Sequence, residues 1–363
     1  MKTNVKKISL LLGLCISAVF LWLFLREIEW DKLYSAMQRA DYIYVIPAVL
    51  ITLVTYLIRT ARWELLVLPI KKVSFPNVLS ATTIGLMANH VLPARAGEII
   101  RCVVLSRSEK VRVTGVFATV IMERLMDSMS LIIFATVVIA VITSHGSGSG
   151  ATEAYTAAGN SIDTHTLLFV QLKKGLGILT GVCIASAILL AFLDIYTQRT
   201  LDLVNKLCFF LPHSIKDIIL HLLESFVRGL KVLKNFRQLL WLSFLSFSLW
   251  ISFVLIMILL GYSFGIDIPF AAMCFVCICI ALAVAIPQAP GYIGVFHYVV
   301  QKSLELFHVA PATAQSYAIV LWSVSIFTSI ILGAFFLWRE GLSFGQMVKA
   351  QEVPGDRNNA NAN

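Results

Sequence analysis

Long runs of apolar residues recur from one end of this chain to the other. They begin near Ile8, Tyr42, Val113, Gly175, Leu239, Pro269 and Val309. The hydrocarbon core of a bilayer is about 30 Å thick and requires roughly 20 apolar residues for one helical crossing, and each run supplies about that length. Because 58% of the 363 residues are hydrophobic and only 13% are charged, with a mean hydropathy of +0.84, soluble classes are excluded. The sequence predicts an all-α polytopic membrane protein.

The distribution of lysine and arginine predicts how the chain is threaded, since cytoplasmic loops are enriched in both. The segments expected on the cytoplasmic side carry Lys2, Lys6, Lys7, Arg59, Arg62, Lys71, Lys72, Arg107, Lys110, Arg112, the stretch 199–237, Arg339, Lys349 and Arg357. The loop 144–171 has no lysine or arginine, and neither does the turn around Asp267. This bias predicts that both termini are cytoplasmic.

The predicted topology is consistent only if two segments leave the membrane on the side from which they enter. These segments, 78–105 and 270–307, are broken by PARAG (93–97) and PQAPG (287–291), which share a P-x-x-x-G spacing. The residues expected to shape the breaks are Pro93, Gly97, Pro287, Pro290, Gly291 and Gly294. Each half then makes three full crossings, so the second half is inverted. We expect an inverted repeat with about six full spans plus two re-entrant hairpins, countable as eight or more transmembrane segments.

The domain organisation follows from this repeat. Residues 1–343 are expected to form one transmembrane domain, with a first half over 8–143 and a second half over 173–339. Residues 344–363 are polar and are expected to form a disordered cytoplasmic tail. The oligomeric state has no signature in the sequence.

The two breaks predict a binding site. Lipid cannot satisfy freed backbone groups, so irregular backbone at membrane depth is tolerated where protein buries it or where it lines a wet cavity. Inverted-repeat transporters place their substrate sites between such broken helices. The alternative is a kinked helix that only packs against its neighbours. Two breaks of like spacing in corresponding positions favour the site.

Charged residues concentrate around the first break and in the span that follows it. They are Arg95, Glu98, Arg101, Glu123, Arg124 and Asp127. A charge at the bilayer centre costs at least about 2.5 kcal/mol, so such residues face partners or water. Glu123 and Asp127 share a helix face because they are four residues apart. The simplest pairing joins Arg95 to Glu123 or Asp127, and Glu98 to Arg124. These residues serve as structural salt bridges, as ligand-binding groups, or as both.

Arginine beside a helix start is well suited to phosphate, because its planar fork donates two hydrogen bonds and the helix N-terminus offers free N–H groups. Arg95 and Arg101 are therefore expected to hold an anionic headgroup, with Glu98 balancing charge or binding an amine. At the second break, Gln288 supplies a neutral amide. The candidate substrate-binding set is Arg95, Glu98, Arg101, Glu123, Arg124, Asp127 and Gln288.

The sequence predicts no metal site and no cofactor. Three of the seven cysteines cluster in MCFVCICI, at Cys274, Cys277 and Cys279, without a second cysteine pair or a nearby histidine. We therefore interpret them as small buried hydrophobic residues. No feature indicates a nucleic-acid partner.

PARAGEIIR (93–101), ERLMD (123–127) and PGYIG (290–294) together resemble the transmembrane family named after lysylphosphatidylglycerol synthase. The likeness runs from about Ile8 to Arg339. This resemblance implies a multi-pass protein of the bacterial cytoplasmic (inner) membrane, in a family to which lipid movement between leaflets is attributed. Relatives that make lysyl-lipid append a soluble aminoacyl-transferase domain, whereas QEVPGDRNNANAN follows here. We therefore expect a stand-alone member without lysyltransferase activity.

Three functions compete on the sequence alone. The first is a lipid flippase for an anionic or zwitterionic, phospho- or polyprenyl-linked lipid, with membrane lipids as its partners. The second is a membrane-embedded lipid-modifying transferase, in which Glu98, Glu123 and Asp127 serve as acid or base. The third is a non-transporting scaffold for a lipid-biosynthesis enzyme. We favour the flippase, which is not an enzyme and has no catalytic residue to assign.

Overall fold

The computed structural model describes residues 2–92, 95–146, 181, 236–285 and 288–341. In these ranges every regular element is helical, and no strand occurs. The α-helices are α1 (Lys2–Arg26), α2 (Trp30–Arg39), α3 (Val45–Val67), α4 (Phe75–Val91), α5 (Gly97–Glu109), α6 (Val113–Gly146), α11 (Phe236–Ser263), α12 (Phe270–Ala285), α13 (Val295–Glu305) and α14 (Pro311–Arg339). The described part of the chain confirms the predicted all-α class.

Four of the described helical segments are long and apolar enough to cross a membrane: Tyr42–Val67, Val113–Val141, Arg237–Ser263 and Pro311–Arg339. They coincide with α3, α6, α11 and α14, and with four of the predicted apolar runs. Large apolar side chains project outward from these helices, including Val54, Leu57, Val137, Phe244, Phe327 and Ile331. Such a surface is suited to lipid. The run predicted near Gly175 and the tail 344–363 lie outside the described residues.

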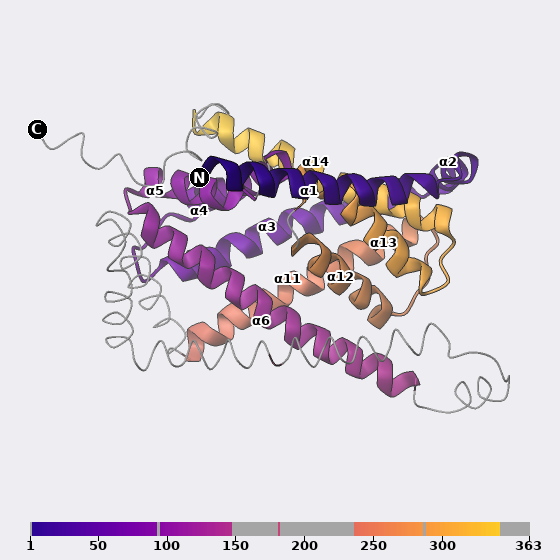
Figure 1. Cartoon of the computed structure of the whole chain (residues 1–363). Coiled ribbons are helices and arrows are strands. Elements are labelled where there is room, and N and C mark those ends of the chain that lie inside the picture. The colour runs from indigo at the N-terminus through magenta and orange to yellow at the C-terminus, as the bar shows by residue number, and fades with distance from the viewer. Residues whose placement is uncertain (1, 93–94, 147–180, 182–235, 286–287, 342–363) are drawn as a thin grey trace, which may run out of the picture.

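The centre of the bundle is the pair α3 and α11, which pack along each other in opposite directions (Figure 1). At one end, the backbone N–H of Asp41 donates to the carbonyl oxygen of Ser263 over 2.8 Å. At the other, Nη1 of Arg62 lies 3.2 Å from Oγ of Ser246. The start of α3 therefore meets the end of α11.

Helices α4 and α5 form the first hairpin and contain 17 and 13 residues. At 1.5 Å per residue they extend about 26 and 20 Å, so each is shorter than the hydrocarbon core. Two glycines let the arms touch: a Cβ on Gly97 would overlap the carbonyl oxygen of Gly85, and a Cβ on Gly85 would lie 2.7 Å from Cβ of Arg101. Any larger side chain at either position would force the arms apart.

Glu109 closes the base of this hairpin. Its Oε1 accepts from the backbone N–H of Ser74 over 2.9 Å and from Nδ2 of Asn77 over 2.8 Å. Its Oε2 lies 3.2 Å from Nζ of Lys71. Burial raises the pKa of Glu109, but the hydrogen bonds and the lysine charge outweigh it, so the pKa lies below its usual value. The carboxylate therefore joins the start of α4 to the end of α5.

Helices α12 and α13 form the second hairpin, joined through the short 3-10 turn η3 (Pro290–Tyr292). Gly291 and Gly294 have φ angles of 70° and 89°, a region that glycine enters without steric cost. Helix α1 supports this turn, because the backbone N–H of Ala289 donates to Oγ of Ser17 over 2.8 Å. A Cβ on Gly294 would overlap the backbone of Ser17. Of the predicted breaking residues, Pro93 and Pro287 lie outside the described ranges.

The two hairpins lie toward opposite ends of the bundle in Figure 1, with α4 and α5 at the left and α12 and α13 at the right. Helix α14 links the two ends. Near its start, Oγ of Ser316 donates to the carbonyl oxygen of Leu33 over 3.2 Å. Farther along it packs on α4, where a Cβ on Gly333 would lie 2.9 Å from the carbonyl oxygen of Thr83. Small residues at such crossings allow the close packing on which helix association in lipid depends.

Candidate functional site

A buried network of charges lies between α3, α5 and α6. Its centre is Glu123, whose side chain is 1% exposed. Nη2 of Arg62 and Nη2 of Arg101 each lie 2.8 Å from its carboxylate, and Nη2 of Arg124 lies 3.4 Å away. Asp127, one turn farther along α6, lies 2.5 Å from Nη1 of Arg62 and 3.3 Å from Nη2 of Arg124. The spacing of Glu123 and Asp127 thus lets one arginine bind both carboxylates.

The structure confirms one of the predicted ion pairs and corrects the other. Nε of Arg124 lies 3.5 Å from Oε1 of Glu98, as expected. The predicted pairing of Arg95 with Glu123 or Asp127 is wrong, because Arg62 occupies both carboxylates. Arg59 and Arg62 count among the charges expected on the cytoplasmic side, but both lie inside α3, and Arg62 is 1% exposed. The count of lysines and arginines on the cytoplasmic side therefore includes a residue that is buried in the bundle.

Within the described residues, the ion-paired network contains equal numbers of cations and anions. Its six members are Arg62, Arg101, Arg124, Glu98, Glu123 and Asp127. Two further arginines, Arg59 and Arg95, come close to this network, but neither has a carboxylate within 4.0 Å in the described ranges. The eight described charged residues, five arginines and three carboxylates, therefore have a formal net charge of +2.

Arg95 lies at the tip of the first hairpin, with a φ angle of 53°. That left-handed conformation costs a residue with a side chain roughly 1–2 kcal/mol. Its Nη2 donates to the carbonyl oxygen of Val284 in the last turn of α12. This places a positive charge at the negative end of a helix dipole and joins the first break to the second hairpin.

Arg59 projects from α3 into the interior of the bundle. Its Nε atom is buried and has no hydrogen-bond partner among the described residues. Its guanidinium carbon lies 5.4 Å from the ring centroid of Phe253, a cation–π contact. Taking a charge out of water costs several kcal/mol unless an opposite charge compensates it. The Arg59 guanidinium therefore has the features of a group that receives an anion.

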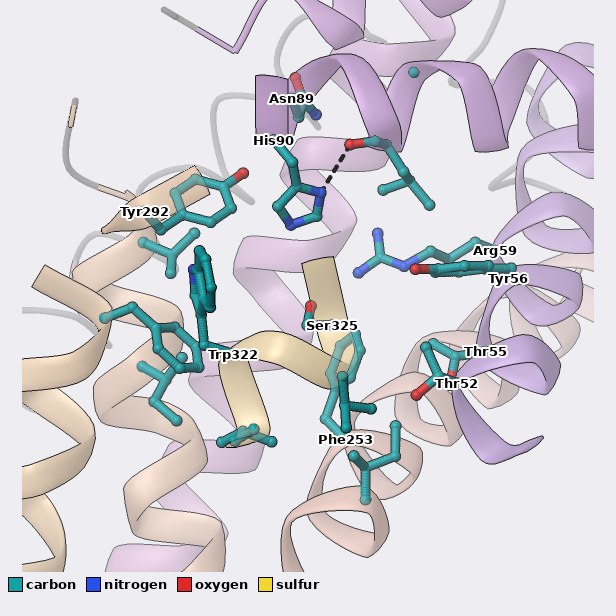
Figure 2. Close-up of a pocket in the computed structure, with 18 of the residues that line it drawn as sticks. Thr52, Thr55, Tyr56, Arg59, Asn89, His90, Phe253, Tyr292, Trp322 and Ser325 are labelled. Atoms are coloured by element: carbon teal, nitrogen blue, oxygen red, sulfur yellow. Dashed lines mark hydrogen bonds between the residues drawn. The ribbon is translucent and has the colours of Figure 1, made fainter. Parts of the chain in front are cut away.

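Arg59 and Arg95 both line a pocket of about 310 Å³, to which α3, α4, α5, α6, α11, α12, η3, α13 and α14 also contribute. Figure 2 shows Arg59 pointing toward the middle of this pocket beside Tyr56, with His90 and Asn89 on one side. Trp322 and Tyr292 face it from across the opening. We refer to this space as the central pocket. Its volume is at the lower end of the range for ligand cavities.

Two neutral polar atoms in the central pocket also lack partners among the described residues. They are Oγ1 of Thr82, on a side chain that is 2% exposed, and Oδ1 of Asn89. A buried polar group without a hydrogen bond costs roughly 1–3 kcal/mol. Together with Arg59 they give the pocket unsatisfied donors and acceptors, as expected for a site that binds a polar ligand.

The remainder of the central pocket is apolar. Its apolar lining consists of Leu86, Phe253, Ile256, Met257, Cys277, Ile280, Val284, Phe296, Leu321, Trp322 and Val324. Cys274 and Cys277 are buried in the surrounding apolar cluster, in line with their interpretation as small hydrophobic residues. A ligand that fills this space must therefore combine a charged part with a hydrocarbon part.

The two breaks meet at this pocket. The His90 and Tyr292 rings stack edge to face with centroids 5.5 Å apart, and Nε1 of Trp322 donates to the carbonyl oxygen of Gly291 over 2.7 Å. Nε2 of Gln288 donates to the carbonyl oxygen of Ala283 over 3.1 Å, and Gln288 does not belong to the lining. The amide predicted to face a ligand is thus used to close the end of α12.

Four of the seven predicted substrate-binding residues line the central pocket, namely Arg95, Glu98, Arg101 and Arg124. Glu123 and Asp127 lie behind them and hold their arginines. Sequence reasoning missed Arg59, which lies three positions after Tyr56 and three before Arg62 and shares a helix face with both. An arginine in the interior of an apolar run, rather than at its end, is the feature that would have identified it.

Comparison with known proteins gives a family and several relatives. The family described as "Lysylphosphatidylglycerol synthase TM region" matches residues 10–333. A UPF0104 membrane protein of Methanocaldococcus jannaschii is 24% identical over 342 residues, covering 92% of this chain and 95% of the relative. A UPF0104 membrane protein of Methanothermobacter thermautotrophicus is 22% identical over 323 residues, covering 81% and 86%. No solved structure matches.

A further relative has an enzyme name. The glycosyltransferase AglD of Haloferax volcanii is 21% identical over 364 residues, which cover 97% of this chain but 58% of AglD. The part of AglD outside the match has no counterpart in this alignment. The similarity therefore concerns a region of AglD rather than the whole enzyme.

Proposed function

Because this chain belongs to the lysylphosphatidylglycerol synthase transmembrane-region family, we propose that it binds the anionic headgroup of a membrane lipid in the central pocket and passes that lipid between leaflets. It is a multi-pass helical membrane protein. The observation that carries the proposal is Arg59, a partly buried arginine whose Nε has no hydrogen-bond partner and whose guanidinium has no carboxylate within 4.0 Å in the described residues. It faces a pocket that is part polar and part apolar.

The finer topology belongs to the same proposal. The lengths of α4, α5, α12 and α13 and the placement of the two hairpins at opposite ends of the bundle support re-entrant hairpins in an inverted repeat. Both termini would then lie on the cytoplasmic side of a bacterial cytoplasmic membrane, where lipid-biosynthesis enzymes are the natural partners. The lipid tails remain in the bilayer while the headgroup crosses between the hairpins.

Within this proposal the residues have separate roles. Arg59 and Arg95 bind the headgroup, since Arg101 and Arg124 are already paired. The network around Glu123 holds α3, α5 and α6 in register and so fixes the direction of Arg59. Movement of the headgroup would exchange the Arg95 contact to Val284 for a contact to the lipid.

The test is transfer of lipids in proteoliposomes. Each lipid carries a dye on an acyl chain, so that its headgroup stays native, and an impermeant reductant bleaches dye in the outer leaflet only. A charged hydrogen bond is worth about 1.5–3 kcal/mol, so Arg59→Gln is expected to slow transfer about ten- to a hundredfold. Arg39→Gln, an exposed arginine on α2, serves as the matched control and should transfer at the wild-type rate.

Two results would overturn the proposal. One is wild-type transfer by Arg59→Gln, which would remove the central pocket from the path. The other is the absence of transfer by wild-type protein with every anionic and zwitterionic lipid offered, in the presence and absence of a proton gradient. The second result would favour a scaffold that does not transport.

A lipid-modifying transferase is the second candidate, favoured by the alignment of nearly the whole chain with a region of AglD. Glu98 is the one carboxylate among the described lining residues, and its side chain is 20% exposed. An enzyme would need Glu98 as acid or base, so Glu98→Gln would abolish turnover of a lipid substrate. A transporter would retain lipid transfer in that variant at a changed rate.

A further inference from the structure

We propose that the central pocket selects a lipid phosphomonoester, such as phosphatidic acid or a prenyl monophosphate, over a phosphodiester lipid. This inference rests on the proposed function, since it names the headgroup class for the same site. The observation that supports this inference is that, in the described residues, two arginines that line the pocket have no carboxylate partner.

The six-residue ion-pair network compensates its own charges. Glu123 is bound by three arginines, and Asp127 and Glu98 share Arg124. Within the described part of the chain this leaves Arg59 and Arg95 as the lining cations with no carboxylate within 4.0 Å. A ligand with two negative charges would therefore neutralise the site, and a ligand with one would leave one positive charge in the pocket uncompensated.

A phosphomonoester has the matching charge and shape. Above its second pKa of about 6 it carries close to two negative charges and presents three terminal oxygen atoms. The guanidinium groups of Arg59, on α3, and Arg95, at the tip of the first hairpin, can each bind the phosphate through a pair of hydrogen bonds. A phosphodiester carries one charge and has two such oxygens, so it cannot satisfy both forks equally well.

The lining argues against headgroups that carry an amine. Glu98 is the one lining carboxylate in the described residues, and Arg124 occupies it at 3.5 Å. An ammonium group placed here would face an excess of arginine without a free anion. Zwitterionic and aminoacylated lipids are therefore disfavoured by the same charges that favour a phosphomonoester.

Size and polarity agree with a small headgroup attached to hydrocarbon. A cavity of about 310 Å³ is small for a ligand site, and a large share of its lining is apolar. Thr82 and Asn89 both belong to the lining, and Oγ1 of Thr82 is a buried polar atom without a hydrogen-bond partner in the described residues. The apolar lining, with Phe253 and Trp322, suits the first carbon atoms of the tail.

The experiment measures stabilisation of the purified, delipidated protein in detergent by soluble lipids. Dihexanoyl phosphatidic acid and dihexanoyl phosphatidylglycerol have the same tails, and the second glycerol of phosphatidylglycerol converts the phosphate from a monoester into a diester. We expect the half-saturating concentration for phosphatidic acid to be about tenfold lower, through the second fork. Geranyl monophosphate should behave like phosphatidic acid, and inorganic phosphate should bind more weakly than either because it has no tail.

Arg59→Gln and Arg39→Gln complete the design. Arg59→Gln removes one unpaired charge and should reduce the preference for the monoester to about twofold or less, whereas Arg39→Gln should keep it. Circular dichroism of both variants verifies that they are folded before titration. The same lipids in the transfer assay give an independent measure of preference.

Each contrary result has a definite meaning. Equal stabilisation by both lipids, or faster Arg59-dependent transfer of phosphatidylglycerol than of phosphatidic acid, would overturn the selectivity while the proposed transport stands. Inorganic phosphate as effective as phosphatidic acid would identify a site for free phosphate and overturn the lipid assignment. If phosphatidic acid stabilises Arg59→Gln as well as wild type, or stabilises neither protein, the inference fails.

Discussion

Two arginines one turn apart on α3 should have opposite effects on stability when each is replaced by glutamine. Arg62 forms ion pairs of 2.8 and 2.5 Å with Glu123 and Asp127 and is 1% exposed. Removing one partner of a buried ion pair costs about 3–5 kcal/mol, because the other charge stays buried. Arg62→Gln is therefore expected to destabilise the protein by about that amount.

Arg59 lies on the same helix as Arg62, but no carboxylate in the described residues pairs with its charge. Arg59→Gln forfeits the cation–π contact with Phe253, worth about 0.5–2 kcal/mol. It also removes a partly buried charge, and full burial of such a charge without a partner costs several kcal/mol. The free energy of unfolding should be unchanged or rise by up to about 3 kcal/mol. Stability and transport thus oppose each other at this residue, as is common for functional sites.

The assay is reversible unfolding of delipidated protein in mixed micelles, with increasing dodecyl sulfate and helicity as the signal. Arg39→Gln gives the background for loss of an exposed arginine. If Arg59→Gln unfolds as easily as Arg62→Gln, then Arg59 is a satisfied structural residue. The argument from unpaired charge would then be refuted. Adding phosphatidic acid should stabilise wild type and leave Arg59→Gln nearly unchanged.

Three further predictions concern the first hairpin. Gly97→Ala should lower the free energy of unfolding by about 1–3 kcal/mol through overlap with Gly85; an unchanged free energy of unfolding would contradict the close contact. Because the pKa of Glu109 is lowered by folding, its contribution is present above about pH 4.3 and is lost as the pH falls through the lower folded pKa. Glu109→Gln should therefore flatten the acid limb of the stability profile, and superimposable profiles would argue against this. Arg95→Gly should be about 1 kcal/mol more stable than Arg95→Ala, and both should transfer lipid slowly; equal stability would speak against the left-handed backbone.

The long helices could be predicted from sequence because an uninterrupted apolar run has one solution in lipid, a helix with all its backbone groups paired. The Glu98 pairing with Arg124 was also accessible, since it needed only neighbouring elements of opposite charge. The inward direction of Arg62 could not be predicted. An arginine near the end of a span has the same sequence pattern whether its side chain reaches the lipid headgroups or turns into the bundle. Its direction is set by Glu123, which is 61 residues away in the sequence.

Arg59 and Arg95 show a second reason why the site was only partly predictable. Charge counts over a motif identify cations, but they do not reveal which of several nearby arginines a few carboxylates occupy. That choice depends on the packing of α3 against α6 and on the left-handed residue at the hairpin tip. The arginines to which we assign headgroup binding are the two that this packing leaves without a carboxylate partner in the described residues.

The support that α1 gives to the second hairpin has a consequence for biosynthesis. Ser17 emerges from the ribosome 272 residues before its partner Ala289, which at about 5–20 residues per second is a delay of roughly 15–55 s. During that interval the first helix waits in the bilayer without its partner. The packing of α1 therefore cannot be completed before the second hairpin has been made. Two separately expressed halves should reach the native arrangement only when both are present in the same membrane.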